Sequence, residues 1–160
     1  MRLTPVVTLI IALLGCATSR SQSTADESGT GRWSATLQQT QQRTGELAPT
    51  GQQKATGSVL LAPSAADPNR MMVQLTISAP SNTSSTLRWG IFPGRCGSSA
   101  LPLVGIEALP TIDVGSNGRG QVTGEIPVRL EAGAMYHVSV FKGRGTDVSD
   151  VLTCGNLRAN

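Results

Sequence analysis

The chain has 160 residues, of which 39% are hydrophobic and only 3% aromatic, and its formal net charge is +3 at pH 7. This length corresponds to about one domain, and the core of that domain must consist mainly of aliphatic side chains. The arginines are scattered along the chain without a basic run, so the sequence argues against nucleic acid as a partner.

The first segment of the chain has the features of an export signal. Arg2 supplies a positive charge, and residues 6–14 form an almost uninterrupted apolar run. This run is too short to span a bilayer, which requires about 20 apolar residues, but it has the length of the hydrophobic region of a signal peptide. It ends in LLGC at residues 13–16, which resembles the lipobox of bacterial lipoproteins. The resemblance implies cleavage before Cys16 and attachment of diacylglycerol to its thiol.

The lipobox divides the chain into three predicted parts. Residues 1–15 are the signal peptide, residues 16–31 are the lipidated cysteine with a flexible tether, and residues 32–160 are the folded domain. The tether is predicted because its small polar residues cannot bury enough surface to offset their ordering entropy. We therefore expect an extracytoplasmic, lipid-anchored protein of a bacterial cell envelope. Ala17 after the cysteine resembles the pattern for the outer membrane of a Gram-negative host.

After the tether, short segments with a period of two alternate with clusters of Gly, Pro, Asn and Ser. Val73, Leu75 and Ile77 alternate with polar residues, as in an antiparallel strand with one buried face. The pair Asn117-Gly118 favours a hairpin turn because it tolerates positive φ. The predicted strands are 33–39, 55–62, 71–79, 85–92, 101–106, 121–129, 135–142 and 150–157.

Seven or eight short strands in about 125 residues predict an all-β fold. We expect an antiparallel β-sandwich with Greek-key-like connections and one disulfide. The segment 135–142 shows the same alternation as the other strands, which places Val138 and Val140 on a buried face. His137 and Ser139 then lie on the opposite, mostly polar face.

The cysteines bear on the compartment. The chain has three, and if Cys16 carries the lipid, then Cys96 and Cys154 remain as a pair. An even pair in an oxidising compartment predicts a disulfide. Two free thiols, or half of a metal site, are the alternatives.

No catalytic constellation is evident in the sequence. His137 is the only histidine and no Gly-x-Ser-x-Gly segment occurs, which disfavours a nucleophilic triad. A glycosidase-like pair of carboxylates would have to form between residues that are distant in sequence. The acidic residues considered for such a pair are Glu107, Asp113, Glu125, Glu131, Asp147 and Asp150.

Metal binding is also disfavoured by the residue types present. Zinc and copper prefer several His or Cys ligands in a defined geometry, and one histidine does not supply them. Met71 and Met72 could offer thioethers to Cu(I), although methionine in a strand is usually packing. We predict no catalytic residues, no metal site and no cofactor.

The region from Thr86 to Leu157 resembles a known group of β-sandwich domains. The segments that carry the resemblance are LRWGIF at 87–92, GRCG at 94–97, MYHVSVFK at 135–142 and LTCGN at 152–156. In this order they resemble domains related to the chordin-type (CHRD) repeat and to copper/zinc superoxide dismutase. The resemblance implies a shared sandwich and supports a bridge between Cys96 and Cys154.

The chain departs from that group at its metal ligands. Bacterial members often carry His-x-His early and Val-His-Lys later, whereas this chain has Arg88-Trp89-Gly90 and Val140-Phe141-Lys142. The ligand histidines of dismutase relatives are thus missing. The resemblance therefore implies a sandwich in which dismutase activity is lost or was never present.

These observations favour a non-enzymatic binding or structural module of the cell envelope, attached to the membrane through Cys16. Its further partner would be an envelope protein or a glycan. The alternative is a metal-handling or dismutase-like protein with unusual ligands, for which His137, Met71 and Met72 are the candidates. A hydrolase built on the dispersed carboxylates is a third class.

Overall fold

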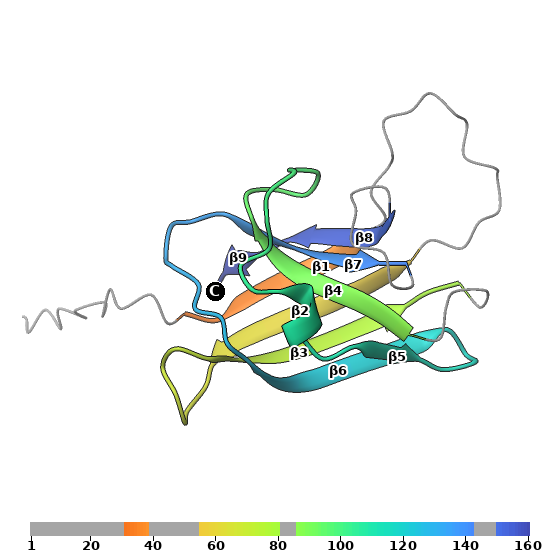
Figure 1. Ribbon diagram of the computed structural model, residues 1–160, viewed down its shortest axis with the longest axis horizontal. Coiled ribbons are helices and arrows are strands. Elements are labelled where there is room, and N and C mark those ends of the chain that lie inside the picture. Colours follow the sequence, from red (N-terminus) through yellow and green to blue (C-terminus); the bar gives the residue numbers. More distant parts are fainter. Residues whose placement is uncertain (1–30, 39–54, 81–85, 143–149) are drawn as a thin grey trace, which may run out of the picture.

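The computed structural model describes residues 31–38, 55–80, 86–142 and 150–160. Their regular structure consists of strands and one short 3₁₀ helix, η1 (Ile106–Ala108), so the all-β prediction is confirmed. No helix in this part of the chain has the length and hydrophobicity needed to cross a membrane. The strands are β1 (Trp33–Gln38), β2 (Thr56–Pro63), β3 (Met71–Ser78), β4 (Thr86–Pro93), β5 (Ile112–Val114), β6 (Arg119–Ile126), β7 (Tyr136–Phe141), β8 (Val151–Asn156) and β9 (Arg158–Ala159) (Figure 1).

Eight of these strands form a closed barrel. Their order is β2-β3-β6-β5-β4-β7-β8-β1, and β1 also pairs with β2, which closes the ring. Every pairing is antiparallel. Strands β4, β5 and β6 are successive neighbours and β7 returns to lie beside β4, which is a Greek key. The Greek-key and antiparallel predictions are therefore confirmed.

The prediction of a sandwich is wrong, because β1 joins what would have been two sheet edges. It pairs with β2 along its whole length, from Trp33↔Leu61 to Gln38↔Thr56. Its other side meets β8 at Gln38↔Cys154 and β9 near its start. Sandwiches and barrels both give strands with one buried face. The alternation in the sequence therefore predicts strands without deciding whether the sheet closes.

One predicted strand is absent. Residues 101–106 belong to the connection between β4 and β5, and β5 lies further along the chain. Pro102 lies within this stretch and cannot donate to a strand ladder. The predicted hairpin at Asn117-Gly118 is confirmed between β5 and β6, where Gly118 has φ of 74° and its N–H donates to Gly115 O (2.9 Å).

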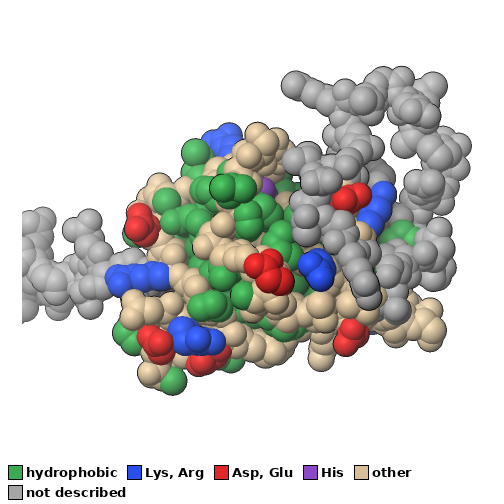
Figure 2. Space-filling view, viewed as in Figure 1, with side chains coloured by type: hydrophobic (Ala, Val, Ile, Leu, Met, Phe, Trp, Pro, Cys, Tyr) green, Lys and Arg blue, Asp and Glu red, His purple; other side chains and the backbone are tan. Residues whose placement is uncertain are grey.

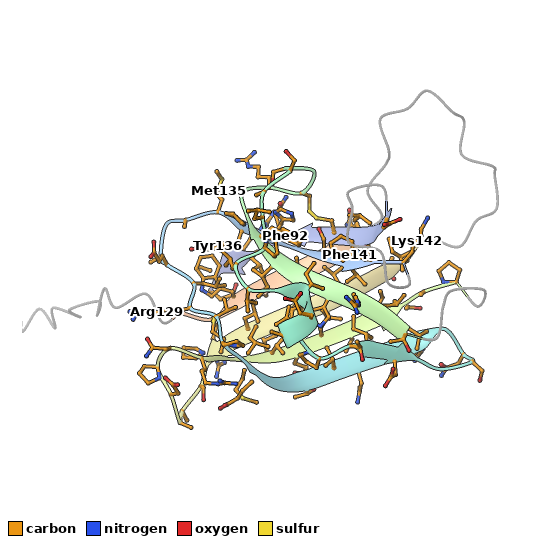
Figure 3. All side chains as sticks on the ribbon, viewed as in Figure 1. Phe92, Arg129, Met135, Tyr136, Phe141 and Lys142 are labelled. Carbon is orange, nitrogen blue, oxygen red and sulfur yellow. A yellow bond between two sulfur atoms is a disulfide. The ribbon has the colours of Figure 1, made fainter. Side chains whose placement is uncertain are left out.

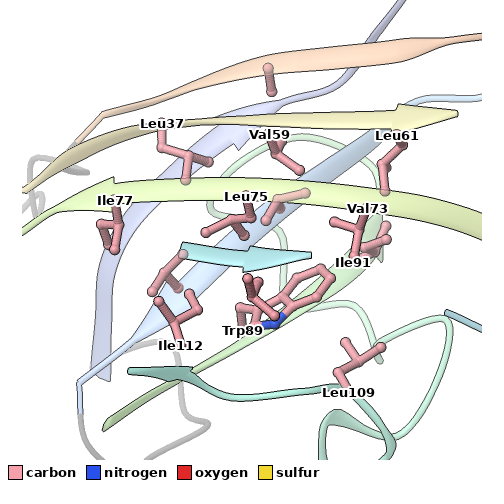
Figure 4. Close-up of a cluster of buried hydrophobic side chains, with 14 of the residues drawn as sticks. Leu37, Val59, Leu61, Val73, Leu75, Ile77, Trp89, Ile91, Leu109 and Ile112 are labelled. Atoms are coloured by element: carbon pink, nitrogen blue, oxygen red, sulfur yellow. The ribbon is translucent and has the colours of Figure 1, made fainter. Parts of the chain in front are cut away.

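The barrel interior holds the main core (Figure 4). It is mainly aliphatic, as the composition predicts, and its largest fully buried side chain is Trp89. The indole Nε1 of Trp89 donates to Pro110 O (2.7 Å), which ties the end of the β4–β5 connection to the core. The most deeply buried residues include Leu37, Leu61, Val73, Leu75, Leu87, Trp89, Ile91, Ile112, Ile126, Val138 and Val140.

Strand directions bring several segments to one end of the barrel, which we call the proximal end. β1 begins there, next to the C-terminal residues 157–160, since Trp33 pairs with Ala159. The connections 64–70 and 127–135 and the first part of the β4–β5 connection, residues 94–105, leave from the same end. This follows because β2, β4 and β6 all run towards it while β3 and β7 run away from it.

Candidate functional site

The outer surface of the barrel has two different walls. The first, which we call the polar wall, consists of the outward side chains of β1, β2, β3 and β6. These positions alternate with buried core residues along each strand. The wall is formed by Ser34, Thr36, Gln38, Thr56, Ser58, Leu60, Met72, Gln74, Thr76, Ser78, Arg119, Gln121, Thr123 and Glu125.

Strand register arranges the polar wall in rows. Thr36 lies opposite Ser58, Ser58 opposite Thr76, and Thr76 opposite Gln121. The hydroxyl oxygens of Ser58 and Thr76 are 3.0 Å apart. Neighbouring strands lie about 4.8 Å apart and same-face residues repeat about every 6.8 Å. The row of Thr36, Ser58, Thr76 and Gln121 therefore presents neutral groups that both donate and accept hydrogen bonds, while the charged residues of the wall, Arg119 and Glu125, lie near the two ends of β6.

An open groove runs along this wall towards β8 and β9. Among the described residues that line it, Arg158 is the only charged one. Asn160 Nδ2 donates to Ser34 Oγ (2.9 Å), which fixes one margin of the groove. The side chains in the groove are otherwise neutral: Ser34, Ala35, Thr36, Gln38, Ser58, Val59, Leu60, Gln74, Thr76, Cys96, Cys154, Asn156 and Asn160.

The second wall, which we call the covered wall, consists of the outward side chains of β4, β7 and β8. The first part of the β4–β5 connection, residues 94–109, lies over it, and we call this segment the cover. Gly94 contacts His137, and Cys96 is bonded to Cys154. Phe92, Ile106 and Phe141 form a hydrophobic cluster that is separate from the barrel core. The rings of Phe92 and Phe141 have centroids 6.0 Å apart in an edge arrangement (Figure 3).

A disulfide holds this cover in place. Cys96, in the cover, is bonded to Cys154 on β8 with an S–S distance of 2.03 Å, which confirms the predicted pair. The N–H of Cys96 also donates to Asn156 Oδ1 (2.8 Å). Ser139 Oγ lies 3.5 Å from the sulfur of Cys154. The cover is thus attached covalently and by hydrogen bonding to β8.

His137 lies under the cover rather than on a polar surface. It is 2% exposed, and its ring stacks on Phe92 at 5.3 Å and 17°. Its Nδ1 is 3.2 Å from Gly94 O. Desolvation lowers the pKa of His137, and the hydrogen bond to Gly94 opposes this effect only in part. The expectation that β7 has a polar outer face is therefore wrong, because residues 94–109 bury it.

The three candidate metal ligands are not brought together. Met71 belongs to the barrel core and Met72 to the outside of β3. His137 is on β7, which is four strands from β3 in either direction around the ring of eight. The described residues contain no group of three or more His, Cys, Asp or Glu that could hold a metal ion.

Two of the candidate carboxylates, Glu125 and Asp113, have structural partners among the described residues. Glu125 forms an ion pair with Arg70 (3.3 Å) and accepts a hydrogen bond from Ser64. Asp113 accepts from Thr86 Oγ1 (3.4 Å). Glu107 and Glu131 are exposed, and Asp147 and Cys16 lie outside the described residues. These contacts give no catalytic pair within the described chain.

Comparison of the chain with protein-family models, curated proteins and solved structures finds no match. The polar wall itself is a feature that the sequence analysis did not single out. Its signal was the run of Ser, Thr and Gln at alternate strand positions, such as Gln74 and Thr76. Only the strand register shows that these residues form continuous rows.

Proposed function

We propose that this chain is an exported lipoprotein of a bacterial cell envelope whose barrel is a non-catalytic binding or structural module. The observation that carries the proposal is the LLGC sequence at residues 13–16, directly after a short apolar run. The disulfide between Cys96 and Cys154 supports it, because such bonds persist in oxidising compartments. It also leaves Cys16 as the one remaining cysteine of three.

The acyl chains give the anchor its strength. Each buried CH₂ contributes about 0.8 kcal/mol to membrane binding, so two or three chains hold a protein stably where one does not. No insertion by the barrel is required for attachment. The resemblance to CHRD-type and dismutase-like domains adds no activity to this proposal.

The test of the anchor is the substitution Cys16→Ser, with Ala17→Ser as its matched control. We expect the control protein to enter the detergent phase on detergent phase separation and to carry the added mass of a diacylglycerol. The Cys16→Ser protein should remain in the aqueous phase without that mass. The proposal would be overturned if the Cys16→Ser protein entered the detergent phase and still carried the added mass of a diacylglycerol.

For the partner of the barrel, the polar wall favours a glycan. Sugar hydroxyls and acetamido groups donate and accept hydrogen bonds, as do Ser58, Gln74 and Thr76, and these neutral side chains do not select for charge. Exposed hydrogen bonds each contribute about 1 kcal/mol or less, and the described lining of the groove includes no aromatic side chain for stacking. We therefore expect weak binding that depends on many contacts along an extended chain.

Sedimentation with purified peptidoglycan sacculi tests this partner. The double variant Gln74→Ala, Thr76→Val should reduce the bound fraction several-fold. The control variant Glu107→Gln alters an exposed residue of η1, outside the polar wall, and should leave the bound fraction unchanged. Equal binding by both variants, or no binding by the unaltered protein, would remove the glycan from the proposal.

A further inference from the structure

Exposed large hydrophobic side chains gather towards the proximal end. Leu101 is 86% exposed, Met135 57% and Leu103 40%. Single exposed leucines are common on protein surfaces, but here the distribution is one-sided. Leu60 and Met72, the other two such residues in the described chain, lie in the halves of β2 and β3 nearer to the same end.

The three most exposed of them flank the end of β4. The N–H of Leu103 donates to Ile91 O (2.8 Å), on one side of the strand. On the other side, the N–H of Gly94 donates to Met135 O (2.7 Å). Figure 3 shows Met135 beside the end of β4, and Figure 2 shows hydrophobic side chains gathered over the connection that follows it. Leu103 and Met135 thus lie on the two sides of the end of β4, and Leu101 precedes Leu103 by two residues.

Four exposed arginines lie in segments at the proximal end. Arg32 precedes β1, Arg95 lies in the cover, Arg129 in the connection to β7 and Arg158 in β9, and all four are exposed. The ion pair found among the described residues involves Arg70, not these four. Glu131 and Asp67 lie at the same end and oppose part of the positive charge.

The route of the chain places this end near the proposed lipid. β1 begins at Trp33, so the segment that leads back to Cys16 leaves the barrel at the proximal end. The predicted tether lies almost entirely outside the described residues; a flexible chain of about 15 residues has an average span of about 20 Å. Such a tether makes contact between the barrel and the bilayer an intramolecular event, so even weak contacts become populated.

We propose that the proximal end is a membrane-contacting surface, on which Leu101, Leu103 and Met135 enter the headgroup region of the bilayer while the arginines bind anionic phospholipid headgroups. This inference rests on the proposed lipid anchor. It gives the barrel a defined orientation, with its strands leading away from the membrane and the polar wall open to the side. Apolar side chains flanked by basic ones are the pattern expected of such interfacial contacts.

Hydrogen exchange of the lipidated full-length protein in vesicles tests this orientation. The vesicles contain phosphatidylcholine with about 30% phosphatidylglycerol, and flotation first reports whether the protein is anchored. We expect peptides from 94–105 and 127–136 to exchange at least about threefold more slowly in vesicles than in detergent. The hairpin at 115–118, at the opposite end, should not change.

Flotation separates failure of the contact from failure of the anchor. A protein that floats with equal exchange at both ends would overturn the membrane-contacting surface and leave the anchor standing. A protein that does not float would overturn both. Hydrogen exchange also tests the role of the apolar side chains. The double variant Leu101→Ser, Met135→Ser should float but lose the protection of 94–105 and 127–136. The variant Leu60→Ser, on the polar wall, should keep that protection.

Charge variants test the arginines without altering the apolar residues. Arg129→Gln should reduce the protection in vesicles that contain phosphatidylglycerol, and Glu131→Gln should increase it. Both effects should vanish in pure phosphatidylcholine, because the surface potential of anionic lipid is what attracts basic side chains. Protection that is insensitive to both substitutions would contradict the role of charge.

Discussion

Strands β3 and β7 have similar sequence patterns and different surroundings. β3 alternates strictly between core and outward positions, and its outward residues Met72, Gln74 and Ser78 are exposed. In β7 all six residues are buried, because residues 94–109 lie over its outer face. The comparison shows that alternation in a sequence identifies the inner face of a strand, whereas a distant segment decides whether the outer face reaches solvent.

The cover differs from the barrel in what holds it. The barrel strands are joined by continuous ladders, whereas the cover is fixed by a few contacts at separate points. They include the Cys96–Cys154 disulfide, the hydrogen bond from Cys96 N–H to Asn156 Oδ1 and the bond from Leu103 N–H to Ile91 O. Directly after the cover, the bond from Trp89 to Pro110 O holds its end. Perturbing these contacts should therefore expose β7 before it disturbs β3.

The largest expected effect comes from removing the disulfide. Cys96 and Cys154 are 58 residues apart in the sequence, and chain entropy for a loop of that length gives about 4 kcal/mol of stabilisation. We expect the double variant Cys96→Ala, Cys154→Ala to lower the free energy of unfolding by about that amount in a denaturant titration.

The order of exposure sharpens this test. Hydrogen exchange in the double variant should increase first in residues 94–105 and β7, while β3 keeps its protection until global unfolding. Equal loss of protection in β3 and β7 would mean that the cover and the barrel unfold as one unit. It would contradict the expectation that β7 is exposed first.

The next largest effect should come from the hydrophobic cluster beneath the cover. Phe141 is 2% exposed and packs against Phe92. Phe141→Ala should cost about 3 kcal/mol, at the low end for a buried phenylalanine because a small cluster can collapse around the cavity. Thr123→Ala, an outward position on β6, is the matched control and should cost less than about 0.5 kcal/mol. Similar costs for the two variants, measured by chemical denaturation, would contradict the covered wall.

His137 adds a pH dependence to the same wall. Its pKa is lowered in the folded protein from the usual value of 6.5, mainly by desolvation, so the unfolded state binds more protons as the pH falls below about 6.5. The free energy of unfolding is therefore highest, as far as His137 is concerned, above that pH, and it decreases as the pH falls towards the lowered pKa. We expect His137→Gln to remove part of the pH dependence of stability between about pH 7.5 and about pH 5.5. Parallel pH profiles for the two proteins would show that His137 titrates as it does in the unfolded chain.

The sequence was informative about local structure and less so about long-range arrangement. Most strands, the Asn117-Gly118 hairpin and the disulfide followed from alternation, turn residues and cysteine count. Closure of the barrel did not, because it depends on β1 pairing on both sides, and neither did the burial of His137. The cover that buries it begins more than forty positions earlier in the chain, at Gly94, which Nδ1 of His137 contacts. The rows of the polar wall likewise required strand register.

The smallest expected effect is on the polar wall, and its size bears on what the wall is for. Ser58 and Thr76 share an exposed hydrogen bond of 3.0 Å, and such bonds contribute little net stability because water replaces them. A double-mutant cycle with Ser58→Ala and Thr76→Val should give a coupling energy below about 0.5 kcal/mol. Coupling above about 1 kcal/mol would make the row a structural device of the sheet. A small coupling together with lost binding to sacculi would instead mean that this neutral row acts on a ligand, because the barrel does not need it to fold.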